Sequence, residues 1–184
     1  MNYGLFRAIN DLSGNRVVDA VMKFAAKYLI VVVFVVVAAL CVREVLRRHW
    51  RPVIATAAAL ALTFVVGLLE AAVHAEKRPF QTHHVHQLVS HAAGQSFPSD
   101  HATAGFGVAL AVTAFLSRRW GMALIPLALL IGFARVYDGI HYPLDIAGGI
   151  LAAAIGVGAV LAVVRLFPPT ARDYRRHRVR VGAR

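Results

Sequence analysis

A histidine and an aspartate lie four positions apart in the second half of the chain, His141 and Asp145. Pro143 stands between them and favours the first turn of a helix, so the carboxylate of Asp145 is expected to reach back to the imidazole. A carboxylate that holds one ring nitrogen fixes the tautomer and orientation of a histidine. The competing interpretation is an ordinary acid that stabilises a helix N-terminus. The pair predicts a nucleophilic His141 oriented by Asp145.

The stretch Phe-Pro-Ser-Asp-His at 97–101 starts a second helix. Ser99 fits a helix cap, and the free amides at a helix N-terminus suit a phosphate group. His101, in the first turn, is then placed to act as a general acid. Arg78 and Arg135 carry forked donors that match phosphate oxygens, although each alone also fits an interface anchor. Together these residues predict hydrolysis of a phosphate ester through a phosphohistidine at His141.

Two further charged residues adjoin the stretches that carry this chemistry. Lys77 precedes Arg78, and Asp100 precedes His101. An acid beside an anionic substrate repels it unless the acid is protonated, paired with a basic residue or turned away. The catalytic set is therefore His141, His101 and Asp145. The predicted substrate-binding residues are Arg78, Ser99, Arg135, Lys77 and Asp100.

The elements that must position these residues are membrane helices. The chain is 59% hydrophobic and 16% charged, and its apolar residues are gathered in runs long enough to cross a bilayer. We predict an all-α, polytopic membrane helical bundle with five transmembrane helices, or six if the N-terminal segment re-enters the membrane. In this arrangement the candidate residues fall at span ends on one membrane face. The predicted spans are residues 17–42, 52–73, 99–116, 122–136 and 143–166.

The organisation on either side of the spans follows from composition. Residues 1–16 hold a short amphipathic segment expected at the membrane interface, and residues 167–184 form a basic tail. The transmembrane catalytic domain covers residues 17–166. Within the long connection 74–97, apolar residues at helical spacing predict a short surface helix over 85–92, which Gly94 ends.

The basic residues predict the orientation of the bundle. Residues 43–51 hold four arginines, residues 118–119 two, and the chain from Arg165 onward seven, which makes 13 of the 20 Lys and Arg. By the positive-inside rule this side is cytoplasmic. We therefore expect an integral protein of a bacterial plasma (inner) membrane with its active site facing the periplasm or the extracellular side. The net charge of +11 could indicate binding to nucleic acid. Because the basic residues flank the membrane spans, we do not expect nucleic acid as a partner.

Other chemistries have weaker support. His84, His86 and His91 offer three possible zinc ligands, but no acidic or cysteine ligand lies beside them, so no metal and no cofactor is expected. A small non-enzymatic transporter or permease would fit Glu70 at membrane depth, although no inverted repeat is visible. The bilayer and a membrane lipid substrate are the expected partners. The sequence leaves a homo-oligomer open.

Three motifs resemble those of the type 2 phosphatidic acid phosphatase (PAP2) superfamily. They are Arg78-Pro79, Pro98-Ser99-Asp100-His101, and Arg135 followed by His141 and Asp145. The resemblance covers roughly residues 70–150 and implies a PAP2/haloperoxidase-like core. It also implies metal-independent hydrolysis through a phosphohistidine. By this resemblance His141 is the nucleophile, Asp145 its partner and His101 the acid, while Arg78, Ser99 and Arg135 bind phosphate.

Three positions depart from the superfamily pattern. Ala71 stands where a lysine is usual, Ala134 replaces a serine, and Asp100 replaces a glycine. The Pro-Ser-Asp-His form resembles the undecaprenyl-diphosphatase branch linked to bacitracin resistance. This branch implies a polyprenyl diphosphate substrate, undecaprenyl diphosphate, and recycling of the lipid carrier of peptidoglycan biosynthesis. Phosphatidylglycerol phosphate, phosphatidic acid or another prenyl diphosphate would present a similar headgroup.

Overall fold

The long apolar runs of the sequence form long helices. The computed structural model describes residues 2–167, and in this range the regular secondary structure is helical, apart from one isolated bridge between Lys77 and Gln95. The all-α prediction is therefore confirmed. The helices are α1 (Asn2–Asn10), α2 (Arg16–Leu46), α3 (Trp50–Val73), α4 (Pro79–Thr82), α5 (Asp100–Ala111), the π-helical turn η1 (Val112–Leu116), α6 (Arg118–Tyr137) and α7 (Pro143–Leu166).

The membrane-spanning helices lie close to their predicted positions. Within the described residues, α2, α3, α6 and α7 are each long and apolar enough to cross a membrane, and α5 with η1 forms a shorter apolar helix. The fourth span begins earlier than predicted, at Arg118 instead of Met122. The chain reverses at Ser117, whose hydroxyl accepts a hydrogen bond from Trp120 N. The two arginines at 118–119 therefore lie in the first turn of α6.

Small residues let α7 approach its neighbours closely. A Cβ atom at Gly156 would lie 2.5 Å from the backbone nitrogen of Thr63 in α3, and one at Gly149 would lie 2.7 Å from the backbone nitrogen of Thr103 in α5. The backbones therefore touch at both crossings, as expected for small residues at membrane helix interfaces. On the other side of α5, an apolar core joins α2, α5, η1 and α6.

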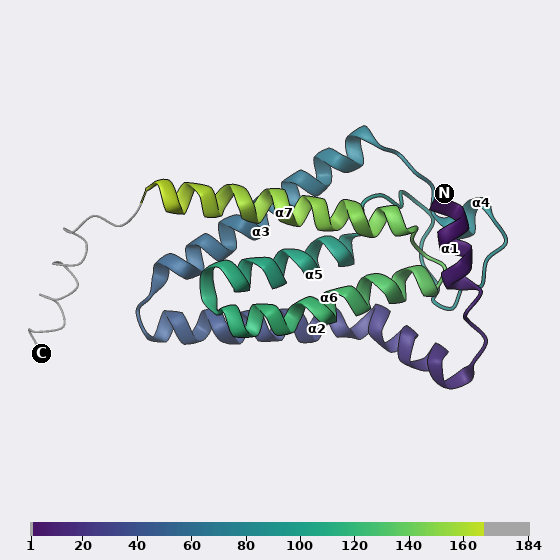
Figure 1. Ribbon diagram of the computed structural model, residues 1–184, viewed down its shortest axis with the longest axis horizontal. Coiled ribbons are helices and arrows are strands. Elements are labelled where there is room, and N and C mark those ends of the chain that lie inside the picture. Colours follow the sequence, from purple (N-terminus) through teal and green to yellow (C-terminus); the bar gives the residue numbers. More distant parts are fainter. Residues whose placement is uncertain (1, 168–184) are drawn as a thin grey trace, which may run out of the picture.

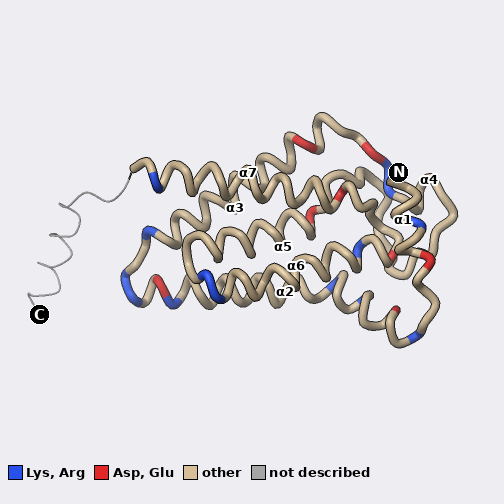
Figure 2. The backbone as a smooth tube through the Cα atoms, viewed as in Figure 1, with Lys and Arg blue, Asp and Glu red and all other residues tan. Residues whose placement is uncertain are grey.

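The two ends of the bundle differ. The long helices run side by side, with α1 and α4 gathered at one end and the last described turn of α7 at the other (Figure 1). Lys and Arg mark the end that holds the α2–α3 connection, the start of α6 and the end of α7 (Figure 2). Acidic and basic residues are mixed at the end near α1 and α4 (Figure 2).

The connection between α3 and α5 differs from the prediction. The surface helix expected over residues 85–92 is absent, and the regular helix in this connection is α4, at Pro79–Thr82. The side chain of Asn10 in α1 holds both backbone groups of His86, at 2.9 Å each, and Leu88 N donates to Asp138 O at 3.1 Å. These tertiary hydrogen bonds use backbone groups that a helix would need, and they override the local helical pattern.

The N-terminal helix α1 packs on this connection and on the start of α7. Phe6 is buried and meets Tyr142 edge to face, with ring centroids 5.4 Å apart. Asn10 also donates to Tyr137 O at 2.8 Å. The helix therefore braces the segment that leads from α6 into α7. The location of α1 at the membrane interface stays a prediction, as do the domain boundaries. The basic tail beyond residue 167 lies outside the described residues.

Candidate active site

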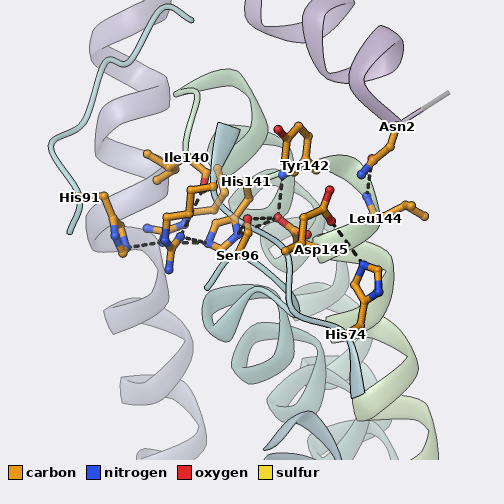
Figure 3. Close-up of polar contacts among 12 residues, drawn as sticks. Asn2, His74, His91, Ser96, Ile140, His141, Tyr142, Leu144 and Asp145 are labelled. Atoms are coloured by element: carbon orange, nitrogen blue, oxygen red, sulfur yellow. Dashed lines mark hydrogen bonds and ion pairs between the residues drawn. The ribbon is translucent and has the colours of Figure 1, made fainter. Parts of the chain in front are cut away.

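Four helix ends bring the predicted residues together at the end of the bundle near α1. Arg78 immediately precedes α4, and Ser99 immediately precedes α5, without a capping hydrogen bond from the Ser99 side chain. Arg135 lies in the last turn of α6, and Asp145 lies in the first turn of α7. His141 stands in the short link between α6 and α7, facing Asp145 (Figure 3). The convergence expected from counting spans is therefore present in the structure.

His141 and Asp145 form a buried pair. Nδ1 of His141 lies 3.1 Å from Oδ2 of Asp145, and the two residues are 1% and 0% exposed. The backbone N–H of Tyr142 donates to the same carboxylate oxygen at 2.8 Å. A carboxylate accepts hydrogen bonds, so the proton in the pair belongs to Nδ1 of the imidazole. Asp145 thus does more than stabilise a helix start.

The other ring nitrogen of His141 faces two arginines. Nη1 of Arg78 lies 2.9 Å from Nε2 of His141, and Nη2 of Arg135 lies 3.3 Å from it. A guanidinium group only donates hydrogen bonds, so Nε2 is the acceptor and carries a lone pair. The same nitrogen is thus free of a proton and flanked by two positive charges. This arrangement fits attack on an anionic electrophile such as phosphorus.

The environment keeps His141 neutral. Burial lowers the pKa of His141 from 6.5 to about 4, and the charges of Arg135 and Arg78 act in the same direction, against the hydrogen bond to Asp145. A neutral imidazole retains the lone pair that a nucleophile needs.

This shift gives a direct prediction for titration. In the substrate-free protein, histidine NMR should show His141 neutral across the physiological range and protonated only as the pH falls through about 4. His141→Gln assigns the signal. A His141 midpoint at or above 6.5 would contradict the buried, arginine-flanked geometry.

Unpaired donors surround the cluster. Ser99 is 0% exposed, and its hydroxyl has no hydrogen-bond partner among the described residues. The same holds for Nε of Arg78 and Nε of Arg135. Buried polar groups are normally hydrogen-bonded, so these donors are available to the oxygens of a phosphate group.

The remaining predicted residues differ in their positions. His101, in the first turn of α5, interacts electrostatically with Arg135 and His141, which places it beside the cluster. Asp100 is exposed, and its charge acts on Arg78 and Arg135. Lys77 is exposed, and no contact between its side chain and the cluster is found in the described residues.

Two of the motif departures lie away from His141. Ala134 is buried against Ala25 and Ala26 of α2, so a missing hydroxyl there removes nothing from the cluster. Ala71 lines an apolar cavity, described below, and its carbonyl accepts a hydrogen bond from the side chain of Gln95.

Two cluster residues were not assigned a catalytic or substrate-binding role in the sequence analysis. Nε2 of His91 accepts a hydrogen bond from Nη2 of Arg135 at 3.2 Å, and its ring lies 6.4 Å from that of His141. Ser96 donates to Oδ2 of Asp145 and lies beside His141 (Figure 3). The signal for Ser96 was its closeness in sequence to Ser99. His91 had no signal beyond its place in a histidine-rich connection.

The alternative zinc site has no geometric support in residues 2–167. No group of three possible metal ligands is found there. His91 lies in the arginine cluster, while Nδ1 of His86 is 2.8 Å from the hydroxyl of Ser13.

The fold defines a polytopic membrane protein, and the cluster joins a buried histidine–aspartate pair to two arginines. Residues 51–168 match the PAP2 superfamily. The chain is 37% identical to undecaprenyl-diphosphatase BcrC of Bacillus subtilis (strain 168), over 84% of this chain and 80% of the relative. It is 30% identical to the protein named bacitracin transport permease protein BcrC of Bacillus licheniformis, over 89% of this chain and 79% of the relative.

A solved structure shares the fold. The crystal structure of Aquifex aeolicus LpxE superposes with a TM-score of 0.71 at 24% identity, covering 88% of this chain and 94% of that one. The chain therefore belongs to the PAP2 superfamily, as its motifs predicted. It is an integral membrane phosphatase.

Proposed function

We propose that the chain hydrolyses undecaprenyl diphosphate to undecaprenyl phosphate and inorganic phosphate at the His141 cluster. The observation that carries this function is the unprotonated Nε2 of His141, which lies between Arg78 and Arg135. The other ring nitrogen, Nδ1, donates a hydrogen bond to Asp145. The relative named as an undecaprenyl-diphosphatase supports the choice of substrate.

The reaction runs in two displacements. Nε2 of His141 attacks the terminal phosphorus, and the bond from phosphorus to the bridging oxygen breaks as undecaprenyl phosphate leaves. His101 supplies a proton where the leaving oxygen needs one. Arg78, Arg135 and Ser99 hold the non-bridging oxygens, whose charge is spread in the transition state. The product of this step is a phosphohistidine whose imidazole ring carries a positive charge.

Water then completes the cycle. His101 in its neutral form takes a proton from the water, whose oxygen attacks phosphorus, and the bond between Nε2 of His141 and phosphorus breaks. Where the leaving oxygen took no proton from His101, this proton then passes to solvent. Inorganic phosphate leaves, and the imidazole returns to its neutral form with the proton on Nδ1. Asp145 accepts a hydrogen bond from Nδ1 throughout and stabilises the positive charge of the intermediate.

A cavity beside the cluster supports a lipid substrate. Its volume is about 460 Å³, and it is lined by residues of α2, α3 and α5. The lining includes Gln95 and Asp100 near the cluster and extends to Phe34 and Val108 in the membrane-spanning helices. An apolar chain attached to a phosphate held by the arginines would find apolar walls there.

The experiment measures phosphate release by the protein purified in detergent, with and without EDTA. We expect release from undecaprenyl diphosphate that chelation does not change, and we expect His84→Ala to match the unaltered protein because His84 is exposed and outside the cluster. Competition with phosphatidylglycerol phosphate, phosphatidic acid and shorter prenyl diphosphates ranks the lipids. Loss of release with EDTA contradicts the metal-free mechanism.

The relative named as a transport permease makes transport the second candidate function. Its test is the same preparation reconstituted in vesicles. Absence of phosphate release from every lipid phosphate, together with movement of a lipid or of bacitracin across the vesicle membrane, would favour transport over hydrolysis.

We also propose that the cluster faces the periplasm or the extracellular side of a bacterial plasma membrane. The basic connections at 43–51 and 118–119 lie at the opposite end of the bundle, which fits a cytoplasmic location. In a protein with Cys41→Ala, a cysteine at Ala93 should react with an impermeant reagent in intact cells. The matched cysteine at Arg119 should react only after lysis. The reverse pattern would overturn the orientation.

A further inference from the structure

Ser96 is a buried residue whose hydroxyl touches both members of the histidine–aspartate pair. It is 1% exposed, and its Oγ donates to Oδ2 of Asp145 and lies 3.4 Å from Nδ1 of His141 (Figure 3). Ser96 lies outside the three superfamily motifs. Its contacts are with the side of the imidazole that faces away from Arg78 and Arg135.

The backbone fixes Ser96 independently of these contacts. Its N–H donates to Glu76 O at 2.7 Å, and the neighbouring Gln95 pairs with Lys77 in an isolated bridge. The same short pairing therefore fixes the backbone positions of Ser96, which follows Gln95, and of Arg78, which follows Lys77. A hydroxyl carried on this pairing has a defined position relative to the nucleophile.

The hydrogen bonds at Asp145 show what the hydroxyl adds. Oδ2 accepts from Nδ1 of His141, from Tyr142 N and from Ser96 Oγ, whereas Oδ1 has no hydrogen-bond partner among the described residues. The three hydrogen bonds that orient the Asp145 carboxylate thus all end on Oδ2. Removing Ser96 leaves the carboxylate freer to rotate about its Cβ–Cγ bond and to present a less favourable lone pair to His141.

We propose that Ser96 is a positioning residue that aims the Asp145 carboxylate at Nδ1 of His141. This holds the hydrogen bond at Nδ1, while the lone pair stays on Nε2, the atom that faces the arginines. No proton moves through Ser96, since its hydroxyl donates to Asp145 both before and after the bond to phosphorus forms. The kinetic part of this inference rests on the proposed phosphatase function.

Kinetics provide the first test. Ser96→Ala should lower kcat about tenfold to a hundredfold with little change in KM, because a hydrogen bond to a charged group is lost away from the substrate. Ser90→Ala, at an exposed serine of the same connection, is the matched control and should leave kcat unchanged. Ser96→Cys, similar in size and a weaker donor, should fall between the two and covers the case in which Ser96→Ala fails to fold.

A double-mutant cycle separates positioning from a general structural effect. If Ser96 acts through Asp145, the variant with both Ser96→Ala and Asp145→Asn should be no slower than Asp145→Asn alone. Multiplying losses in the double variant would overturn the proposal. So would a Ser96→Ala protein with the kcat of the unaltered protein.

The hydrogen bond at Nδ1 of His141 gives a readout that needs no substrate. Nitrogen NMR should show the Nδ1-protonated form in both the unaltered protein and the Ser96 variant, because the arginines at Nε2 only donate. The Nδ1–H signal should shift in Ser96→Ala or, if that protein does not fold, in Ser96→Cys, because the carboxylate is held less firmly. An unchanged Nδ1–H signal would overturn the positioning role. If no lipid phosphate is hydrolysed, the proposed function fails, while the Nδ1–H signal still tests Ser96.

Discussion

Replacing His141 with alanine should reduce hydrolysis of undecaprenyl diphosphate to background. The substitution removes the atom that bonds to phosphorus, and the remaining arginines can only bind the substrate. Loss of a nucleophile that works as a unit with its partners lowers kcat by about 10⁴-fold or more. The measurement is phosphate release under saturating substrate, with His84→Ala as the control for loss of an exposed histidine from the same end of the bundle.

His141→Ala also offers a positive result. His141 is 1% exposed in the unaltered protein, so the substitution leaves a small buried space between Asp145 and the two arginines. Added imidazole should restore part of the activity, because a free ring placed there has the same partners. Near-native turnover without imidazole, in a variant that melts at the same temperature as the unaltered protein, would refute the nucleophile assignment.

Replacing His101 with asparagine should slow substrates according to their leaving groups. A lipid phosphate monoester expels an alkoxide that needs a proton, so kcat/KM should fall by about 10²–10⁴-fold. An aryl phosphate expels a stabilised phenoxide, and its loss should be about tenfold or less. Undecaprenyl diphosphate expels a phosphate ester, which also leaves readily, and should behave like the aryl phosphate.

The ratio kcat/KM isolates the relevant step. It reports formation of the phosphohistidine and departure of the leaving group. By contrast, kcat also contains the attack of water, and in that step every substrate needs His101 as the base. Equal losses in kcat/KM for the lipid monoester and the aryl phosphate would count against His101 as the general acid.

Much of the site could be predicted because its residues lie at ends of long apolar runs. The length of a membrane span is set by the bilayer, so counting spans places Arg78, Ser99, Arg135 and Asp145 on one face. Helix-start residues act locally, and α7 begins at Pro143 as its sequence indicates. The relation between His141 and Asp145 follows from the first turn of that helix.

The connection between α3 and α5 could not be predicted in the same way. Its path is set by partners far away in sequence, among them Asn10 in α1 and Asp138 after α6. Apolar spacing at 85–92 therefore indicated a helix that the tertiary hydrogen bonds exclude. For the same reason the contacts of His91 with Arg135 and of Ser96 with Asp145 became visible only in the structure.

Asp100 is the acid whose place beside an anionic substrate the sequence left open. The structure leaves Asp100 exposed, and its charge acts at longer range on Arg78 and Arg135. Asp100 also lines the apolar cavity. In the proposed function it would therefore lie where the headgroup meets the lipid chain.

The stereochemistry of phosphoryl transfer tests the role of His141 most directly. The terminal phosphate of the substrate is made chiral with sulfur and two oxygen isotopes and is hydrolysed in water enriched in the third isotope. Two in-line displacements, first by Nε2 of His141 and then by water, predict retention of configuration at phosphorus, whether or not the intermediate accumulates. Inversion would mean that water attacks the substrate directly and would contradict a phosphohistidine.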